Sequence, residues 1–110
     1  TLFRSVNTVC SGVAYSCASF VLASGTGLRF ASKNSRIMVH QCSLSAQDFN
    51  NIEEMKSLNS ELKFSNNKVF SLYEEYTKGK ISVKNIRHFN KDRFLNAEEA
   101  KDLGIVDFVY

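Results

Sequence analysis

The feature that most constrains the fold is a short apolar strand that runs through a glycine into a helix with a serine at its start. Val6 to Cys10 is rich in β-forming residues, which predicts a strand. Gly12 interrupts this pattern, and small residues then lead through Ser16 into an apolar helical run that stops at Gly25. Such a junction holds a hydroxyl at a helix start and points the following N–H groups at whatever it attacks. A junction built from small residues for packing is the alternative.

Composition limits the class of protein further. The chain has 110 residues, 44% of them apolar and 23% charged, which is typical of one small globular domain. Lys and Arg are spread along the chain and the net charge is only +3, so no nucleic acid partner is expected. No apolar run reaches the ~18 residues that span a bilayer, and no membrane partner is expected.

Cysteine and histidine spacing gives no sign of a metal site. Cys10, Cys17 and Cys42 are odd in number and form no C-x-x-C motif, which predicts free thiols in a reducing compartment. His40 and His88 lie at no ligand spacing to each other or to the cysteines, so zinc is not expected. We expect neither a metal nor another cofactor in this chain.

A second apolar strand ends in a histidine. Arg36 to Gln41 is a nearly continuous apolar run, which is typical of a strand buried on both faces in an α/β sheet. A shorter strand is predicted before it, at Leu28 to Ala31. His40 therefore lies at a strand end, where open α/β sheets place their sites. A hydrogen-bonded structural histidine is the alternative.

A long amphipathic helix is predicted from about Ser45 to Tyr76. Apolar residues recur there at steps of three and four with charges between them, and a break near 65–67 stays open. The helix is longer than a core of this size can cover, which indicates an oligomer contact or a projecting arm. An ordinary amphipathic core helix is the alternative.

The last third is predicted to alternate short elements. Gly79 ends the long helix, Ser82 caps a short helix through Ile86, and residues 90–95 form a charged extended link. A capping box then starts a helix at 97–103, and the final strand is expected at 105–109. Taken alone, an aspartate in the 90–95 link would be a solvated surface residue.

Three separated blocks now stand together. They read GVAYS at 12–16, NSRIMVHQ at 34–41, and DRFLNAEEA at 92–100 followed by LGIVD at 103–107. In kind, order and spacing these blocks resemble the proteolytic subunits of the Clp protease, the ClpP family. The family patterns are G-x-A-A-S-M-G, N-S-R-x-M-I-H-Q-P and R-D-x-F-[LM]-[ST]-A-x-E-A-x-x-[YH]-G-[LI]-[VI]-D. The resemblance covers essentially the whole chain and only the later part of a ClpP subunit.

The resemblance implies a fold and a set of roles. The fold would be α/β, a ClpP/crotonase-like spiral of ββα units, incomplete without an N-terminal segment. Residues 1–110 would be the C-terminal part of one peptidase domain, with a long handle helix at approximately 45–76. Ser16 would be the nucleophile, His40 the general base and Asp92 the carboxylate that orients the base. The backbone N–H of Cys17 would be one oxyanion donor.

The chemistry independently fits that assignment. A serine hydroxyl is a weak nucleophile until a base takes its proton, and the imidazole needs a third group to fix its tautomer and stabilise the imidazolium. The chain departs from the family pattern at several positions, including Ala18 in place of a glycine, residues 43–46 in place of a glycine-rich turn, and residues 90–91 in place of an acidic residue and Arg. Tyr15 and Cys17 flank the nucleophile where Ala and Met are usual, and Cys42 replaces a proline.

The implied function is a serine endopeptidase subunit of an ATP-dependent Clp protease barrel that hydrolyses unfolded proteins. Its partners would be other ClpP- or ClpR-type subunits in a double heptameric ring and an AAA+ ATPase that uses the ATP. The chain begins at Thr1 without Met and lacks the family's oxyanion glycines, so we expect a separate N-terminal chain to complete the subunit. Abundant Asn, Lys, Ser and Phe are typical of an AT-rich coding genome such as that of a plastid. This composition favours the chloroplast stroma, with a bacterial cytoplasm as the alternative.

Three other functions stay open. A catalytically weak or inactive ring subunit, as in the ClpR paralogues, is the first, although such subunits usually lack triad residues that this chain keeps. A crotonase-type acyl-CoA enzyme shares the spiral fold but would not need Ser16, His40 and Asp92 together. Cys17 as the true nucleophile is a variant of the leading hypothesis.

Overall fold

The computed structural model describes residues 4–43 and 51–110. The order strand–strand–helix occurs twice, as β1 (Thr8–Cys10), β2 (Val13–Tyr15), α1 (Cys17–Ala23), β3 (Arg29–Ala31), β4 (Arg36–Val39) and α2 (Ile52–Tyr76). The chain then continues through a 3₁₀ helix η2 (Val83–Phe89), β5 (Arg93–Asn96), α3 (Ala97–Asp102) and β6 (Phe108–Val109). These successive ββα units form the α/β spiral that the sequence predicted.

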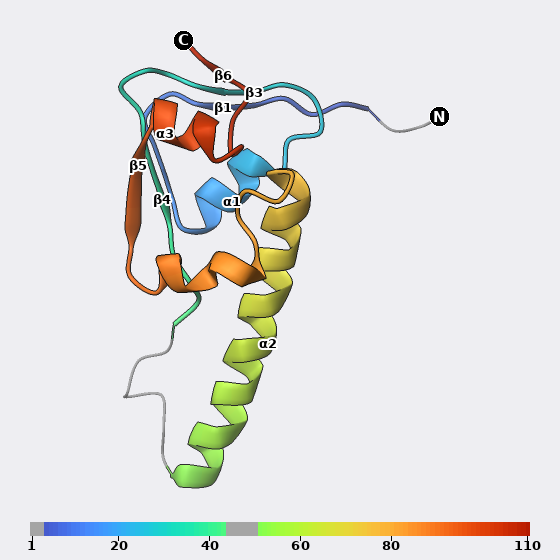
Figure 1. Cartoon of the computed structure of the whole chain (residues 1–110), viewed down its shortest axis with the longest axis vertical. Helices are drawn as coiled ribbons and strands as arrows, with labels where there is room; N and C mark the ends of the chain where they lie inside the picture. The colour runs from blue at the N-terminus through green and yellow to red at the C-terminus, as the bar shows by residue number, and fades with distance from the viewer. Residues whose placement is uncertain (1–3, 44–50) are drawn as a thin grey trace.

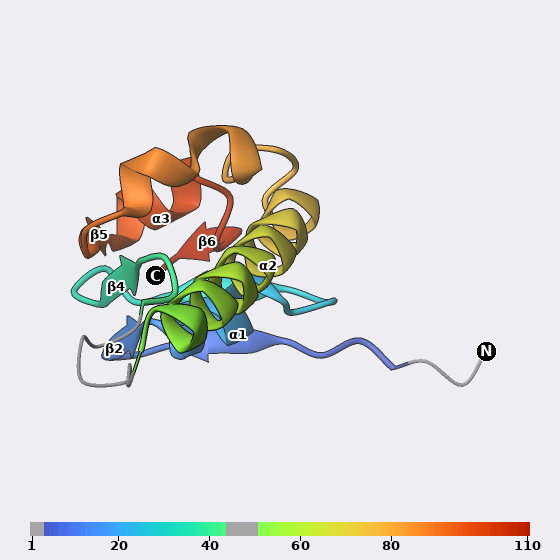
Figure 2. The ribbon, with the colours of Figure 1, turned by 90° about the horizontal axis from the view of Figure 1, so that it is seen from below.

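The strands form two small sheets. In the first, β1, β3 and β6 lie in the order β1-β3-β6 and are all parallel. In the second, the order is β2-β4-β5, with β2 parallel and β5 antiparallel to β4. Figure 1 shows the first sheet at one end of the molecule, while β4 and β5 run away from it beside α1. Figure 2 shows α2 passing alongside α1, and the two helices are in contact.

Two segments form strands where the sequence predicted something else. Val13 to Tyr15 was expected to lead directly into a helix, but a bend at Ser11 and Gly12 carries the chain into the second sheet as β2. The side chains alternate there, with Ala14 buried between two exposed neighbours. The expected link at 90–95 likewise contains a strand, because β5 pairs along the full length of β4.

α2 is one uninterrupted helix of 25 residues. It begins at Ile52, later than the predicted start near Ser45, because Asn51 is extended and its side chain accepts the Glu54 N–H at 2.7 Å. The remainder of the predicted start, residues 44–50, lies outside the described residues. No break occurs near 65–67, and Figure 1 shows the first half of α2 extending beyond the rest of the molecule.

The C-terminal elements follow the prediction more closely. The Asn96 side chain accepts the Glu99 N–H at 2.8 Å, and the Glu99 carboxylate accepts the Asn96 N–H at 3.0 Å, so the predicted capping box starts α3. Gly104 has a φ of +75°, and a Cβ there would lie 2.9 Å from the Thr77 carbonyl oxygen. Glycine is therefore needed for α3 to end against the C-terminus of α2.

The hydrophobic core lies between the two sheets and the helices. Its fully buried large side chains come from β4, α2, the loop before η2, η2 itself, β5 and the turn before β6: Ile37, Val39, Phe70, Ile81, Phe89, Leu95, Ile105 and Val106. The predicted final strand at 105–109 is shorter, because its first residues form this buried turn instead.

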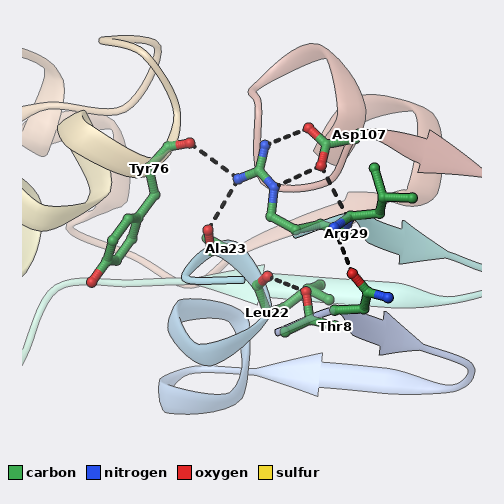
Figure 3. A network of polar contacts seen from close by, with 8 residues as sticks. Thr8, Leu22, Ala23, Arg29, Tyr76 and Asp107 are labelled. Atoms are coloured by element: carbon green, nitrogen blue, oxygen red, sulfur yellow. Dashed lines mark hydrogen bonds and ion pairs between the residues drawn. The ribbon is translucent and has the colours of Figure 1, made fainter. Parts of the chain in front are cut away.

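A largely buried polar network joins the first sheet to α1 and α2. The guanidinium of Arg29 binds both carboxylate oxygens of Asp107, at 3.0 and 2.7 Å, and donates to the carbonyl oxygens of Ala23 and Tyr76 at 3.0 Å each. Figure 3 shows these four acceptor oxygen atoms around the guanidinium. One side chain therefore connects β3 with the loop before β6 and with the ends of α1 and α2.

Among residues 4–43 and 51–110, no helix has both the length and the apolar character that crossing a membrane requires.

Candidate active site

The three predicted triad positions converge at one edge of the second sheet. Ser16 directly follows β2 and His40 directly follows β4, and because these strands are parallel, both residues lie at the same edge. β5 runs antiparallel to β4 and its pairing joins Val39 to Arg93. The next positions in that register are His40 and Asp92. The order of strands thus brings together residues that are 24 and 52 positions apart.

Ser16 and His40 are directly hydrogen-bonded. The Ser16 Oγ lies 2.8 Å from His40 Nε2, and both residues are half-buried. Ser16 is the residue before α1 and has a φ of 62° and a ψ of −119°, which is unusual for a residue with a side chain. Its N–H donates to the Met38 carbonyl oxygen at 2.9 Å. The serine thus occupies a sharp strand-to-helix turn, as the sequence predicted, but the strand that precedes the turn is β2 rather than β1.

The second ring nitrogen of His40 fixes its tautomer. Nδ1 contacts the carbonyl oxygen of Gln41, which can only accept a hydrogen bond. In the neutral ring, Nδ1 therefore carries the proton and Nε2 is left to accept from the Ser16 hydroxyl. This is the tautomer that a general base for serine requires.

Asp92 is adjacent in the strand register but is not bonded to the histidine. Its side chain is exposed, and within the described ranges it makes no hydrogen bond or ion pair. The Gln41 carbonyl takes the place on Nδ1 that a triad carboxylate would occupy. The structure therefore brings two of the three predicted residues into contact and leaves the third at the same sheet edge.

The predicted oxyanion donor lies at the start of α1. Cys17 is the first residue of that helix, and its N–H has no acceptor among the residues that the structure describes. Its thiol is exposed and free, as are the thiols of buried Cys10 and half-buried Cys42. Next to the serine, the Tyr15 ring packs edge-to-face on Phe94, with 5.6 Å between ring centroids. That contact holds the Tyr15 ring against β5.

Sequence reasoning missed the polar residues that support this site. Ser19 lies on α1, Asn66 and Tyr73 lie on α2, and all three are buried. Burial raises the pKa of Tyr73 to about 12, although the Ser19 hydroxyl could stabilise the phenolate and opposes this rise. One signal was present in the sequence: Asn66 is a polar residue within the apolar stripe of α2, where an unpaired amide would be costly.

The described part of the chain contains no group of three or more His, Cys, Asp or Glu side chains placed to hold a metal ion.

The chain is similar in sequence to known proteins over nearly its whole length. The family model for Clp protease matches residues 2–110. ATP-dependent Clp protease proteolytic subunits from Oltmannsiellopsis viridis and Chlorella vulgaris are 42% and 41% identical to this chain over 105 residues, and proteolytic subunit 2 from Mycobacterium leprae is 34% identical. Each alignment covers 94% of this chain and 52%, 51% and 49% of those proteins.

The chain therefore belongs to the Clp protease family. It spans about half the length of the curated relatives it matches. These relatives come from green algae and from a mycobacterium.

Proposed function

We propose that this chain carries the catalytic part of a Clp-type serine endopeptidase subunit. The observation that supports the proposal is the 2.8 Å hydrogen bond between Ser16 Oγ and the acceptor nitrogen of His40. Family membership and the names of the relatives point to the same reaction class. A crotonase-type enzyme is disfavoured, because it has no need for a serine paired with a histidine.

The proposed reaction begins when Ser16 gives its proton to His40 Nε2 and its Oγ attacks a peptide carbonyl carbon. The carbonyl oxygen becomes an oxyanion, to which the free N–H of Cys17 would donate. His40 then passes the proton to the leaving amine, and an acyl ester on Ser16 remains. Water hydrolyses this ester by the same proton transfers in reverse.

Asp92 would act on the base rather than on the substrate. The Gln41 carbonyl sets the tautomer of His40 but carries no full charge with which to stabilise an imidazolium. We propose that Asp92, which faces His40 in the register of β4 and β5, takes over this contact during the reaction. An inactive or weakly active ring subunit is the second candidate, and the unbonded Asp92 is the observation that favours it.

A fluorophosphonate probe tests the assignment in the assembled complex. An active serine peptidase should be labelled at Ser16, and the label should be lost in Ser16→Ala. Cys17→Ala should still be labelled, because its thiol is not the nucleophile. Sensitivity to iodoacetamide without fluorophosphonate labelling would identify Cys17 instead, and the absence of both reactions would favour the inactive ring subunit.

We further propose that a separate N-terminal chain completes the subunit along β1 and β2. Both are outer strands of their sheets within the described fold, with unpaired backbone groups on one side. Val9 and Val13 are 58% and 65% exposed, and a groove of about 480 Å³ lies between these strands and α1. Added sheet pairing here would cover this surface and bring a second oxyanion donor near Ser16.

Mass measurement of every chain in the purified complex tests this partner. A separate polypeptide that corresponds to the other half of the relatives should co-purify in equal amount. The same segment joined covalently to residues 1–110 would contradict a separate chain, although it would leave the docking surface intact.

The further partners follow the family. α2 exposes Ile52, Met55 and Phe64 in its first half, the last of these to 65%. We propose that this surface joins ClpP- or ClpR-type subunits across a double heptameric ring, which an AAA+ ATPase supplies with unfolded protein. Phe64→Asp should then split the particle into single rings in native mass spectrometry. The algal relatives favour the chloroplast stroma, and the mycobacterial relative keeps a bacterial cytoplasm open.

A further inference from the structure

The buried side of α2 makes two polar contacts with the segments that carry the proposed nucleophile and base. Asn66 and Tyr73 lie seven residues apart, which is two helical turns, and both face the core. Tyr73 reaches the backbone of Ser16 through one intermediate side chain. Asn66 reaches the backbone that follows His40. One helix therefore contacts both halves of the site.

The contact to Ser16 is a directional relay. Ser19 Oγ lies 2.6 Å from the Ser16 carbonyl oxygen and 2.9 Å from the Tyr73 hydroxyl oxygen. Because a carbonyl can only accept, Ser19 donates its single hydroxyl proton to Ser16, and Tyr73 must donate to Ser19. Ser19 is fully buried and Tyr73 is 2% exposed, so bulk water does not replace either bond. The raised pKa of Tyr73 keeps its phenol in the donor form at working pH.

Ser16 is the residue that needs such support. A non-glycine residue with a φ of 62° and a ψ of −119° carries backbone strain and persists only when its surroundings hold it. The Ser16 N–H donates to the Met38 carbonyl, and the Ser16 carbonyl accepts from the Ser19 hydroxyl at 2.6 Å and from the Ser19 and Phe20 N–H groups at 3.1 and 3.4 Å. Together they fix both peptide groups of the turn, and this sets the direction in which Oγ points.

Asn66 holds the other half of the site. Its Oδ1 accepts the Cys42 N–H at 2.7 Å, and its Nδ2 donates to the Cys42 carbonyl at 3.4 Å. The preceding residue, Gln41, donates its N–H to the Phe89 carbonyl at 2.8 Å. The backbone is thus fixed at two successive residues after His40. The Asn66 contact depends on the residue at 42, because the proline of the family pattern would have no N–H to donate.

We propose that Tyr73 and Asn66 are positioning residues, which hold Ser16 and His40 at the separation and orientation that proton transfer between them requires. The inference rests on the proposed hydrolase function. It assigns to the buried stripe of α2 a role beyond packing, carried by two polar groups that never touch substrate.

Tyr73→Phe tests the relay, with Tyr76→Phe as a matched control. Tyr76 lies on the same helix and packs on Phe20 as Tyr73 does, but its hydroxyl has no hydrogen-bond partner among the described residues. In the complete assembled complex, Tyr73→Phe should lower kcat for a fluorogenic peptide and the rate of fluorophosphonate labelling by about 10- to 100-fold. KM should not change, because only the geometry of the reacting atoms is altered. Tyr76→Phe should leave kcat, KM and labelling unchanged.

Asn66→Ala tests the second contact, with its exposed neighbour as the control. Asn66→Ala should lower kcat and the labelling rate, and Asn66→Asp should recover part of the loss, since a carboxylate oxygen still accepts the Cys42 N–H. Asn67→Ala should have no effect, because that side chain is exposed and makes no bond within the described fold.

The outcomes separate this inference from the function on which it rests. If the unmodified complex is labelled and Tyr73→Phe behaves like Tyr76→Phe, positioning by α2 is refuted while the peptidase assignment stands. If the unmodified complex neither reacts with the probe nor cleaves peptide, both are refuted. Should Tyr73→Phe lower the melting temperature, Ser19→Ala tests the same relay from α1, because it removes the hydroxyl that donates to the Ser16 carbonyl. A loss of activity that only follows the loss of stability across these variants would also refute positioning.

Discussion

The Arg29–Asp107 network and the Ser16–His40 site use polar groups in opposite ways. Arg29 is 8% exposed, and its guanidinium is bonded to a carboxylate and to two carbonyl oxygens from other elements (Figure 3). At the site, Ser16 and His40 are half-buried and bonded to each other, while Asp92 is exposed and unbonded within the described fold. The polar groups of the Arg29–Asp107 network have their hydrogen-bond partners within the protein, whereas Asp92 at the site can still accept a hydrogen bond.

The difference indicates which polar groups serve the fold and which serve chemistry. A buried charge is tolerated only when it is paired, so Arg29 needs all of its hydrogen-bond partners for the first sheet to meet α1 and α2. A catalytic group must instead remain able to exchange partners during a reaction. Removing a polar group from the site should therefore lower activity and leave stability unchanged. Removing one from the Arg29–Asp107 network should lower stability first.

The largest expected effect is that of Ser16→Ala. Removing the nucleophile of a triad leaves only the catalysis due to binding and the oxyanion hole, so peptide hydrolysis should fall by several orders of magnitude. The lost hydroxyl is small and lies at a helix start, so assembly and melting temperature should not change. Kinetics on a fluorogenic peptide, in a ring where this is the only competent subunit, measures the loss. Retention of full activity would contradict the assignment of Ser16.

Asp92→Asn should have the next largest effect. If Asp92 stabilises the imidazolium of His40, kcat should fall by about 10⁴-fold. Stability should change by less than about 0.5 kcal/mol, because the side chain is exposed and makes no bond to any residue that the structure describes. Asp102→Asn is the matched control, since that aspartate is also exposed. Unchanged activity in Asp92→Asn would mean that the Gln41 carbonyl alone orients the base.

Arg29→Met should show the reverse pattern. The substitution keeps much of the side-chain volume but leaves Asp107 and two carbonyl oxygens without their donor. We expect a loss of roughly 3 kcal/mol in the free energy of unfolding, at the low end for a broken buried pair because Asp107 is partly exposed. Arg36→Met is the control, because Arg36 is exposed. Denaturant unfolding of the complete subunit measures both, and equal losses would contradict a special role for Arg29.

The sequence predicted the fold where local signals and long-range pairing agree. The apolar run that becomes β4, the capping box of α3 and the periodicity of α2 each specify their own element. β2 and β5 were missed because their strands depend on pairing with β4, which no window of neighbouring residues reveals. The start of α2 was placed too early, because the apolar periodicity of the sequence extends to the N-terminal side of Asn51, the extended residue that caps the helix.

The candidate site likewise has parts that the sequence could predict and parts that it could not. Ser16 and His40 were predictable because each ends a recognisable element and falls within a specific motif. The contact of Nδ1 with Gln41 was not predictable, since it depends on a ring rotation rather than on residue type. Arg29 and Asp107 are 78 positions apart and belong to no motif that forecasts their pairing.

The smallest expected effect concerns pH. The hydrogen bond from Arg29 holds the pKa of Asp107 below its usual value. A depressed folded-state pKa gives stability that is fully present above the unfolded pKa, about 3.9, and is lost as pH falls through the lower folded value. The difference in unfolding free energy between the unmodified protein and Asp107→Asn should therefore be constant from neutral pH down to about 4 and should shrink below it. The change should be modest, because the Asp107 side chain is 35% exposed and solvent screens the pair. A difference that stays constant below pH 4 would show that the charge of Asp107 adds nothing to the network, and that its geometry alone joins the first sheet to α1 and α2.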